Sequence, residues 1–179
     1  MSEEEIWRGA GLALHLAPNM ASFQQGDLDG LCGLYSVINA IRIARYPIRP
    51  LSMKECSDLF QNGVSRLSKT GHLAEFVCEG MEWRYVSNLA TSLCKAASVD
   101  NRILRPRKPK STFDKRQRWE WIIHQISKER PVMIHLSKRD HYSVITGISQ
   151  KRIRLFDSSA SYWANRDDRD VIRLIAIAT

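Results

Sequence analysis

The 179-residue sequence has no uninterrupted apolar run close to the roughly 20 residues that a membrane-spanning helix needs. We therefore expect no membrane span. The N-terminus, Met1-Ser2-Glu3-Glu4-Glu5, is acidic, whereas a secretory signal begins with a basic segment. We expect a cytoplasmic protein, or an effector that is secreted without a cleavable Sec signal.

Cysteine is scarce and widely spaced. The four cysteines stand at positions 32, 56, 78 and 94, form no CxxC pair and have no histidine-rich cluster beside them. This pattern argues against a zinc site, and we expect no metal and no cofactor. A chain of this length can build a core without disulfides, so we expect all four to be thiols. Cys94 lies in an apolar helical segment and is expected to be buried.

What the sequence does contain is typical of a globular protein, with 44% apolar and 26% charged residues. A second independent core would leave both halves small, so we expect a single domain over residues 1–179. Lysine plus arginine outnumber aspartate plus glutamate by 27 to 19, which gives a net charge of +8. This charge favours acidic partners, whether nucleic acid, an anionic membrane or an acidic protein, without choosing among them.

Helical spacing of apolar residues dominates the first two thirds of the chain. It predicts helices from about Gly33, over 83–97 and over about 114–128. A Ser-x-x-Glu capping box that begins at Ser52 predicts a shorter helix to about Gln61. We expect residues 1–24 to form an arm or an edge strand, and residues 98–112 to form a loop with one short strand around Ile103.

The last third is rich in β-branched and aromatic residues. Four segments are predicted as strands, namely 131–136, 141–148, 152–156 and 171–178. Helices followed by antiparallel strands make an α+β fold, in which N-terminal helices pack on a C-terminal antiparallel β-sheet.

Cys32 lies where a turn rich in glycine and aspartate meets the first predicted helix. A free thiol is mostly protonated at neutral pH, and the positive end of a helix favours the reactive thiolate. A nucleophilic cysteine also needs an imidazolium that protonates the leaving group, and a third polar side chain that orients the imidazole. The position of Cys32 therefore makes it a candidate nucleophile.

His141 begins one predicted strand and Asp157 follows the next. If these strands pair as a hairpin, the two side chains become neighbours and an imidazole–carboxylate hydrogen bond is within reach. His135, in the middle of an apolar strand, is the alternative histidine and is expected in the core. Asp157 could instead cap a turn with Ser158 and Ser159.

An oxyanion hole needs donors aimed at the reacting carbonyl oxygen. The backbone N–H of Cys32 can supply one. The side-chain amide of Gln25, seven residues upstream, is the candidate for the other, and Gln24 is the alternative.

Three motifs together resemble the papain-like cysteine peptidases. They are Gln25…Asp29-Gly30-Leu31-Cys32-Gly33-Leu34-Tyr35-Ser36, His141-Tyr142-Ser143-Val144-Ile145-Thr146-Gly147 and Leu155-Phe156-Asp157-Ser158. These motifs are most similar to the compact branch related to bacteriocin-processing double-glycine peptidases. The resemblance implies a papain-like fold with Gln25 as oxyanion donor, Cys32 as nucleophile, His141 as acid and base, and Asp157 as the residue that orients His141. It spans roughly residues 24–159, although 41–134 contains no motif that matches. The double-glycine substrate is not carried over, because those domains are fused to a transporter and this sequence contains none.

The expected function is hydrolysis of a peptide, isopeptide or other amide bond through a thioester acyl-enzyme, with a protein or peptide substrate that the net charge suggests is acidic. An acyltransferase, or a toxin or effector, would use the same triad. The alternative from another class is a basic binding or adaptor protein that docks nucleic acid, the less favoured partner, or an acidic protein. Its docking surface would be the basic stretch from Arg102 to Arg118, for which a solvated loop and helix face is the simpler interpretation. Tyr162 and Trp163 could form a substrate wall, or pack in the ordinary way.

Overall fold

The computed structural model describes residues 12–15, 17, 20–26, 29–99, 102–137, 139–159, 162–166 and 173–179. Over these residues the chain forms five helices: α2 (Cys32–Arg45), α3 (Met53–Ser68), α4 (Leu73–Glu79), α5 (Trp83–Ala97) and α6 (Lys115–Ser127). The strands are β1 (Leu12–Ala13), β2 (Arg105–Arg107), β3 (Val132–Leu136), β4 (His141–Ile148), β5 (Arg152–Phe156), β6 (Trp163–Asn165) and β7 (Leu174–Ala178). The predicted α+β class, with helices first and antiparallel strands afterwards, is confirmed. In the part of the chain described, no helix combines the length and the apolar character that crossing a bilayer requires.

The strands form one open sheet in the order β2-β7-β3-β4-β5-β6, and every neighbouring pair is antiparallel. The short strand β1 pairs with the end of β4, where Leu12 lies opposite Ile148. Within the predicted N-terminal arm or edge strand, residues 1–11, 16 and 18–19 lie outside the described residues, and β1 is the strand found in the rest.

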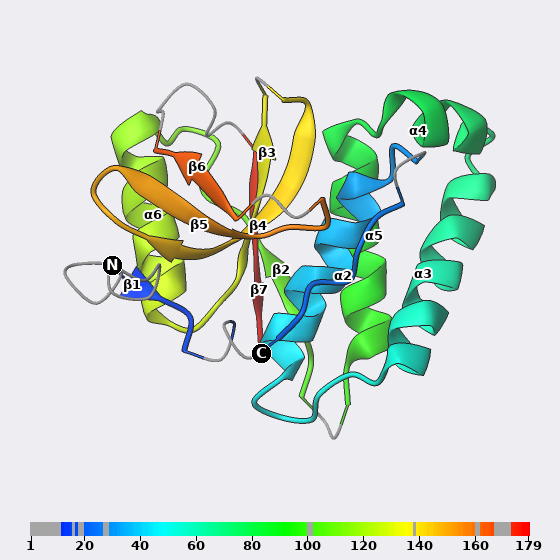
Figure 1. Ribbon diagram of the computed structural model, residues 1–179, viewed down its shortest axis with the longest axis horizontal. Helices are drawn as coiled ribbons and strands as arrows, with labels where there is room; N and C mark the ends of the chain where they lie inside the picture. Colours follow the sequence, from blue (N-terminus) through cyan, green and yellow to red (C-terminus); the bar gives the residue numbers. More distant parts are fainter. Residues whose placement is uncertain are drawn as a thin grey trace.

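Helices cover both faces of the sheet (Figure 1). Helix α6 lies on one face and contacts β1, β3 and β4, whereas α2 lies on the other and contacts β3, β4 and β7. Helices α3 and α5 pack on α2 from outside, and α4 contacts α3. Helix α2 is consequently buried on almost all sides, and its apolar residues join those of the sheet in one hydrophobic core.

Capping boxes fix the start of two helices. Ser52 Oγ accepts the backbone N–H of Glu55, and the Glu55 carboxylate accepts the backbone N–H of Ser52. Asp114 and Gln117 make the same reciprocal pair at the start of α6. Each arrangement satisfies donors that a helix N-terminus otherwise leaves unpaired.

The predicted helices and strands are found over the described residues, with three differences; residues 171–172 of the predicted strand 171–178 lie outside those residues. Helix α3 runs on to Ser68 rather than ending near Gln61, because Gly63 lies inside it and the missing Cβ lets Leu34 of α2 pack there. The short strand expected around Ile103 lies instead at Arg105–Arg107, where it pairs with β7. Helix α4 and strand β6 were not predicted, because stretches of seven and three residues are too short to set a clear period.

Candidate active site

Cys32 is the first residue of α2, at the loop-to-helix junction that the sequence predicts, and it is buried. The turn before it is held in two ways. Asp29 Oδ1 accepts the backbone N–H of Leu31 at 3.0 Å, and Gly30 N donates to Val77 O at 2.6 Å. The first N–H groups of a helix have no intrahelical acceptor, so Cys32 stands at the positive end of α2.

The turn presses directly against the C-terminal end of α4. A Cβ at Gly30 would lie 2.8 Å from the backbone nitrogen of Gly80 and 2.9 Å from the carbonyl oxygen of Phe76. Backbone atoms cannot move aside as a flexible side chain can, so only glycine fits at position 30. Helix α4, which sequence reasoning missed, thus sets the position of the turn that carries Cys32.

A β-bulge decides which face of the sheet Asp157 occupies. Near the turn, Ile148 pairs with Ile153, but further along the hairpin Val144 pairs with Phe156, and the register shifts between Ile145 and Gly147. Continuing the shifted register sets Asp157 opposite Ser143, on the face that also carries His141. Without the bulge Asp157 would lie opposite Val144 and point to the other face, because a slip of one residue reverses side-chain direction.

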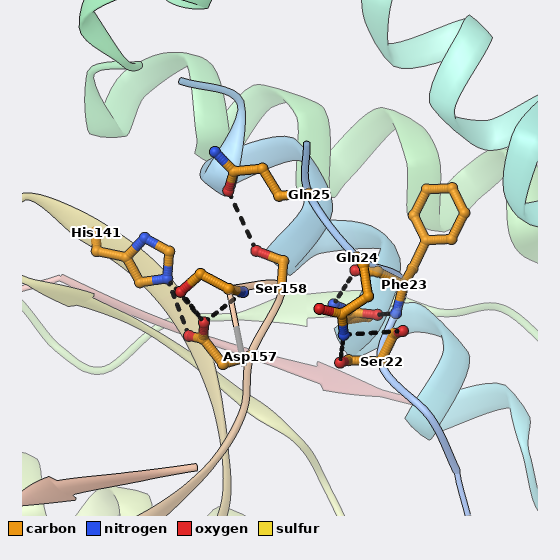
Figure 2. Close-up of polar contacts among 9 residues, drawn as sticks. Ser22, Phe23, Gln24, Gln25, His141, Asp157 and Ser158 are labelled. Atoms are coloured by element: carbon orange, nitrogen blue, oxygen red, sulfur yellow. Dashed lines mark hydrogen bonds and ion pairs between the residues drawn. The ribbon is translucent and has the colours of Figure 1, made fainter. Parts of the chain in front are cut away.

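The predicted hairpin is therefore present, and His141 and Asp157 are diagonal neighbours across it. His141 Nε2 lies 2.9 Å from Asp157 Oδ2 and 3.2 Å from Oδ1 (Figure 2). The side chain of Asp157 is only 1% exposed, and that of His141 is 18% exposed. The pair is thus sheltered from water but still reachable at the imidazole.

Asp157 has further polar partners. Its Oδ1 accepts the backbone N–H of Ser159 at 2.8 Å and the Ser159 hydroxyl at 2.6 Å. The two interpretations of Asp157 are therefore compatible, since it both caps a turn and bonds to His141. Ser143 Oγ is buried close to the carboxylate and helps to lower its pKa, although it forms no hydrogen bond of good geometry with a described atom.

The charges of the pair favour an imidazolium beside a carboxylate. Burial by itself would lower the pKa of His141, but hydrogen bonds to Asp157 and Cys32, together with the charges of both, raise that pKa to about 9. Burial would raise the pKa of Asp157, but hydrogen bonds from His141 and Ser159, together with the nearby Ser143 hydroxyl, lower it to about 2. At neutral pH His141 therefore carries its proton.

The imidazole ring lies between Cys32 and Asp157. Because Nε2 is bonded to Asp157, Nδ1 is the nitrogen left to interact with Cys32, which also acts on the pKa of His141. Cys32, His141 and Asp157 thus form one connected chain. Such a chain can carry a proton from the ring to a leaving group while the carboxylate holds the ring in place.

Gln25 and Gln24, the candidate oxyanion donors, are placed differently. Gln25 is tied to the segment after Asp157, since its backbone N–H donates to Ser158 O at 3.0 Å and its Oε1 accepts from Ser158 Oγ at 3.3 Å (Figure 2). Its Nε2 donates to Asp29 O, and the amide has a second N–H to offer. Gln24 bonds instead to Ser22 and is exposed. Of the two glutamines, Gln25 is therefore the one linked to the residue that follows Asp157.

Sequence reasoning named Ser158 and Ser159 only as turn partners of Asp157 and gave Ser143 no role. Ser158 contacts Gln25, while Ser143 and Ser159 surround Asp157. The available signal for Ser143 was its place two residues after His141, on the same face of the strand.

The alternative histidine behaves as expected. His135 is buried, and its Nε2 lies 2.8 Å from Asp140 Oδ1, a carboxylate whose side chain is 80% exposed. The ring lies against Tyr142, on the face opposite to His141. No described nucleophile accompanies this second His–Asp pair.

The basic stretch from Arg102 to Arg118 does not behave as one unit. Arg116 pairs with Glu120 along α6 at 2.8 Å, whereas Arg102, Arg105 and Arg107 line one pocket beside the last residues of β7. Of the two aromatic residues proposed as a wall, Tyr162 is 64% exposed and Trp163 is part of β6.

The described residues offer no candidate metal site. Over the described residues, no group of three or more histidine, cysteine, aspartate or glutamate side chains is placed to hold an ion. Cys32, His141, Asp157 and Gln25 are therefore the residues on which a functional assignment can be built. Comparison with protein-family models, with curated proteins and with solved structures finds no match for this chain.

Proposed function

We propose that the protein is a papain-like cysteine hydrolase, a peptidase that cleaves a peptide, isopeptide or other amide bond. The observation that carries the proposal is the hydrogen-bonded pair of His141 and Asp157 beside Cys32, at the start of a buried helix. A structural cysteine needs neither an imidazolium nor a buried carboxylate behind it. A nucleophilic cysteine needs both.

In the proposed reaction, Sγ of Cys32 attacks the carbonyl carbon of the scissile amide. The negative charge that develops on the carbonyl oxygen is stabilised by the backbone N–H of Cys32 and by Nε2 of Gln25. His141 transfers its proton to the leaving nitrogen, the C–N bond breaks, and a thioester remains on Cys32. His141, now neutral, takes a proton from a water molecule as the water oxygen attacks the thioester carbon. The C–S bond then breaks, which releases the carboxylic acid and regenerates the thiolate of Cys32.

Asp157 and Ser158 act through these residues. Asp157 fixes the ring of His141 and stabilises its charged form. Ser158 holds Oε1 of Gln25, which fixes the orientation of the amide and leaves Nε2 as the donor. Acyl transfer to an amine in place of water would use the same groups.

The test measures the reactivity of the four cysteines with iodoacetamide at about pH 6, followed by mass spectrometry of the peptides. The chain supplies its own controls, because Cys78 is exposed whereas Cys32, Cys56 and Cys94 are buried. Burial also raises the pKa of Cys56, and that of Cys94 to about 12. We expect Cys32 to react first, ahead of the more accessible Cys78.

Two comparisons complete the experiment. His141→Gln should slow the alkylation of Cys32 and leave that of Cys78 unchanged, because only Cys32 depends on the imidazolium. Cleavage of a whole-proteome extract by the wild type should then be lost in Cys32→Ala. Alkylation in order of exposure, with Cys78 first and Cys32 no faster than Cys56, would refute the proposal.

A further inference from the structure

A pocket of about 260 Å³ lies against Asp157 and the end of β5. Its lining includes Ser22, Gln24, Arg154, Asp157 and Tyr162. We call it the Arg154 pocket. Figure 2 shows Ser22 and Gln24 across Asp157 from the imidazole. Since a water molecule occupies about 30 Å³, the pocket has space for several waters or for one medium-sized side chain.

Arg154 is the one basic side chain among the described residues that line this pocket. Among the described residues it has neither a carboxylate partner nor a side-chain hydrogen bond, whereas Arg49 and Arg116 are each paired with a glutamate. Arg154 is partly buried, and a guanidinium without such a partner favours an incoming carboxylate, which it can bind through two parallel hydrogen bonds. The side chain of Tyr162, which carries a hydroxyl and is 64% exposed, also lines the pocket.

Asp157 does not cancel the positive charge of the pocket. Its carboxylate is 1% exposed and already accepts hydrogen bonds from His141 and Ser159. The imidazolium beside it balances its charge. Asp157 therefore lines the pocket without presenting a free negative group to a ligand. The other polar side chains described there are neutral, namely those of Ser22, Gln24, Thr146 and Tyr162.

We propose that the Arg154 pocket binds an aspartate or glutamate side chain of the substrate, and so selects for an acidic residue near the scissile bond. This inference rests on the proposed function. An extended peptide advances ~3.3 Å per residue, so a side chain a few residues from the bond attacked by Cys32 can reach beyond Asp157. The net charge of +8 attracts such substrates from a distance, and Arg154 supplies the local recognition.

The first experiment tests binding without requiring activity. Cys32→Ala protein labelled with ¹⁵N is titrated with N-acetylglutamate amide, whose only carboxylate is on the side chain. N-acetylglutamine amide is the uncharged match, and N-acetylglutamine offers a terminal carboxylate instead. We expect saturating shifts of the backbone signals of Thr146, Arg154 and Tyr162 with the first ligand alone. No saturating shift, or equal shifts with the uncharged ligand, would overturn the proposal, and a response to the terminal carboxylate alone would overturn the choice of a side chain.

Arg154→Gln and Arg152→Gln form a matched pair of variants. Both lie on β5 and lose one positive charge, but Arg152 is exposed and outside the pocket. Arg154→Gln should abolish the shifts and Arg152→Gln should retain them. An equal loss in both would mean general electrostatic attraction and would refute a specific site. The ¹H–¹⁵N spectra report whether each variant is folded, and Arg154→Lys, which keeps the charge, should bind with intermediate strength.

The second experiment measures selectivity in a library of proteome-derived peptides. Sequences cleaved by the wild type should be enriched in aspartate or glutamate at one position. Arg154→Gln should lower cleavage of those sequences roughly tenfold to a hundredfold, the range expected for a charge-assisted hydrogen bond. Arg154→Glu should reverse the preference toward lysine and arginine. Efficient cleavage with no acidic preference would refute the pocket alone, whereas absence of cleavage with intact ligand binding would refute the proposed function alone.

Discussion

Replacing Asp157 by asparagine keeps the shape of the side chain and a hydrogen-bond acceptor, but removes the negative charge beside His141. In the wild type, hydrogen bonds to Asp157 and Cys32 outweigh burial and raise the pKa of His141 from 6.5 to about 9. In Asp157→Asn, burial is opposed by Cys32 alone. We therefore expect the pKa of His141 to fall to roughly its ordinary value of 6.5 or lower.

The same pKa values predict how stability depends on pH. A rise from 6.5 to about 9 corresponds to about 3 kcal/mol, and Asp157→Asn should remove nearly all of it, because the pKa of His141 then returns to about its ordinary value. A raised pKa stabilises the fold fully below pH 6.5, and this contribution is lost as the pH rises through about 9. The lowered pKa of Asp157 adds stability that is present above pH 3.8 and is lost as the pH falls through about 2. The pair therefore contributes most between about pH 4 and 6.5.

Two measurements test this reasoning. The ring proton signal of His141 is followed by NMR from pH 5 to pH 10, and urea unfolding is measured at pH 5.5 and pH 10. The free energy of unfolding should differ between wild type and Asp157→Asn by about 3 kcal/mol more at pH 5.5 than at pH 10. Asp140→Asn is the matched control, since Asp140 bonds to His135 but is 80% exposed. An unchanged titration of His141 in Asp157→Asn, or an equal stability difference at both pH values, would refute the coupling.

Three further predictions concern the helix start and its surroundings. Gln25→Ala should lower kcat roughly 100-fold, as expected for loss of an oxyanion donor, while Gln24→Ala should change it only slightly; equal effects would remove Gln25 from the oxyanion hole. Gly33→Ala should destabilise the protein by roughly 1–3 kcal/mol in urea unfolding, because the new Cβ would lie 2.6 Å from Val86 Cγ2. Ser52→Ala should cost about 1 kcal/mol through loss of the α3 capping box, and a stability equal to that of the wild type would contradict the cap.

The residues that sequence analysis placed well are those whose local pattern and tertiary environment agree. The apolar stripe after Gly33 predicts a helix, and α2 is indeed buried on almost every side. The capping residues at Ser52 and Asp114 start helices where expected. Strands β4 and β5 have the bounds that alternation predicted, 141–148 and 152–156, and they pair as the hairpin on which the choice of His141 and Asp157 depends.

What the sequence could not supply is set by contacts between distant segments. Gly30 looks like an ordinary turn glycine, yet the backbone of α4 is what excludes a side chain there. Gly63 looks like a helix end, yet Leu34 packs against it inside α3. The Arg154 pocket combines an N-terminal arm with β5, two segments more than 100 residues apart, and Arg154 itself has no pattern that marks it. The local periodicity of apolar residues carries no information about contacts between segments that are far apart in the sequence.

The bulge between Ile145 and Gly147 is the clearest feature that the sequence did not predict, because it decides whether Asp157 and His141 lie on the same face of the sheet. Simple alternation puts His141 and Ser143 on one face of β4, but it cannot say whether Asp157 joins them. One extra residue on β4 decides that, since it sets Asp157 opposite Ser143 instead of Val144. The pairing of the His141 imidazole with the Asp157 carboxylate therefore requires the extra residue that β4 has between Ile145 and Gly147. The bulge is thus what directs the buried carboxylate of Asp157 toward His141, whose ring also interacts with Cys32.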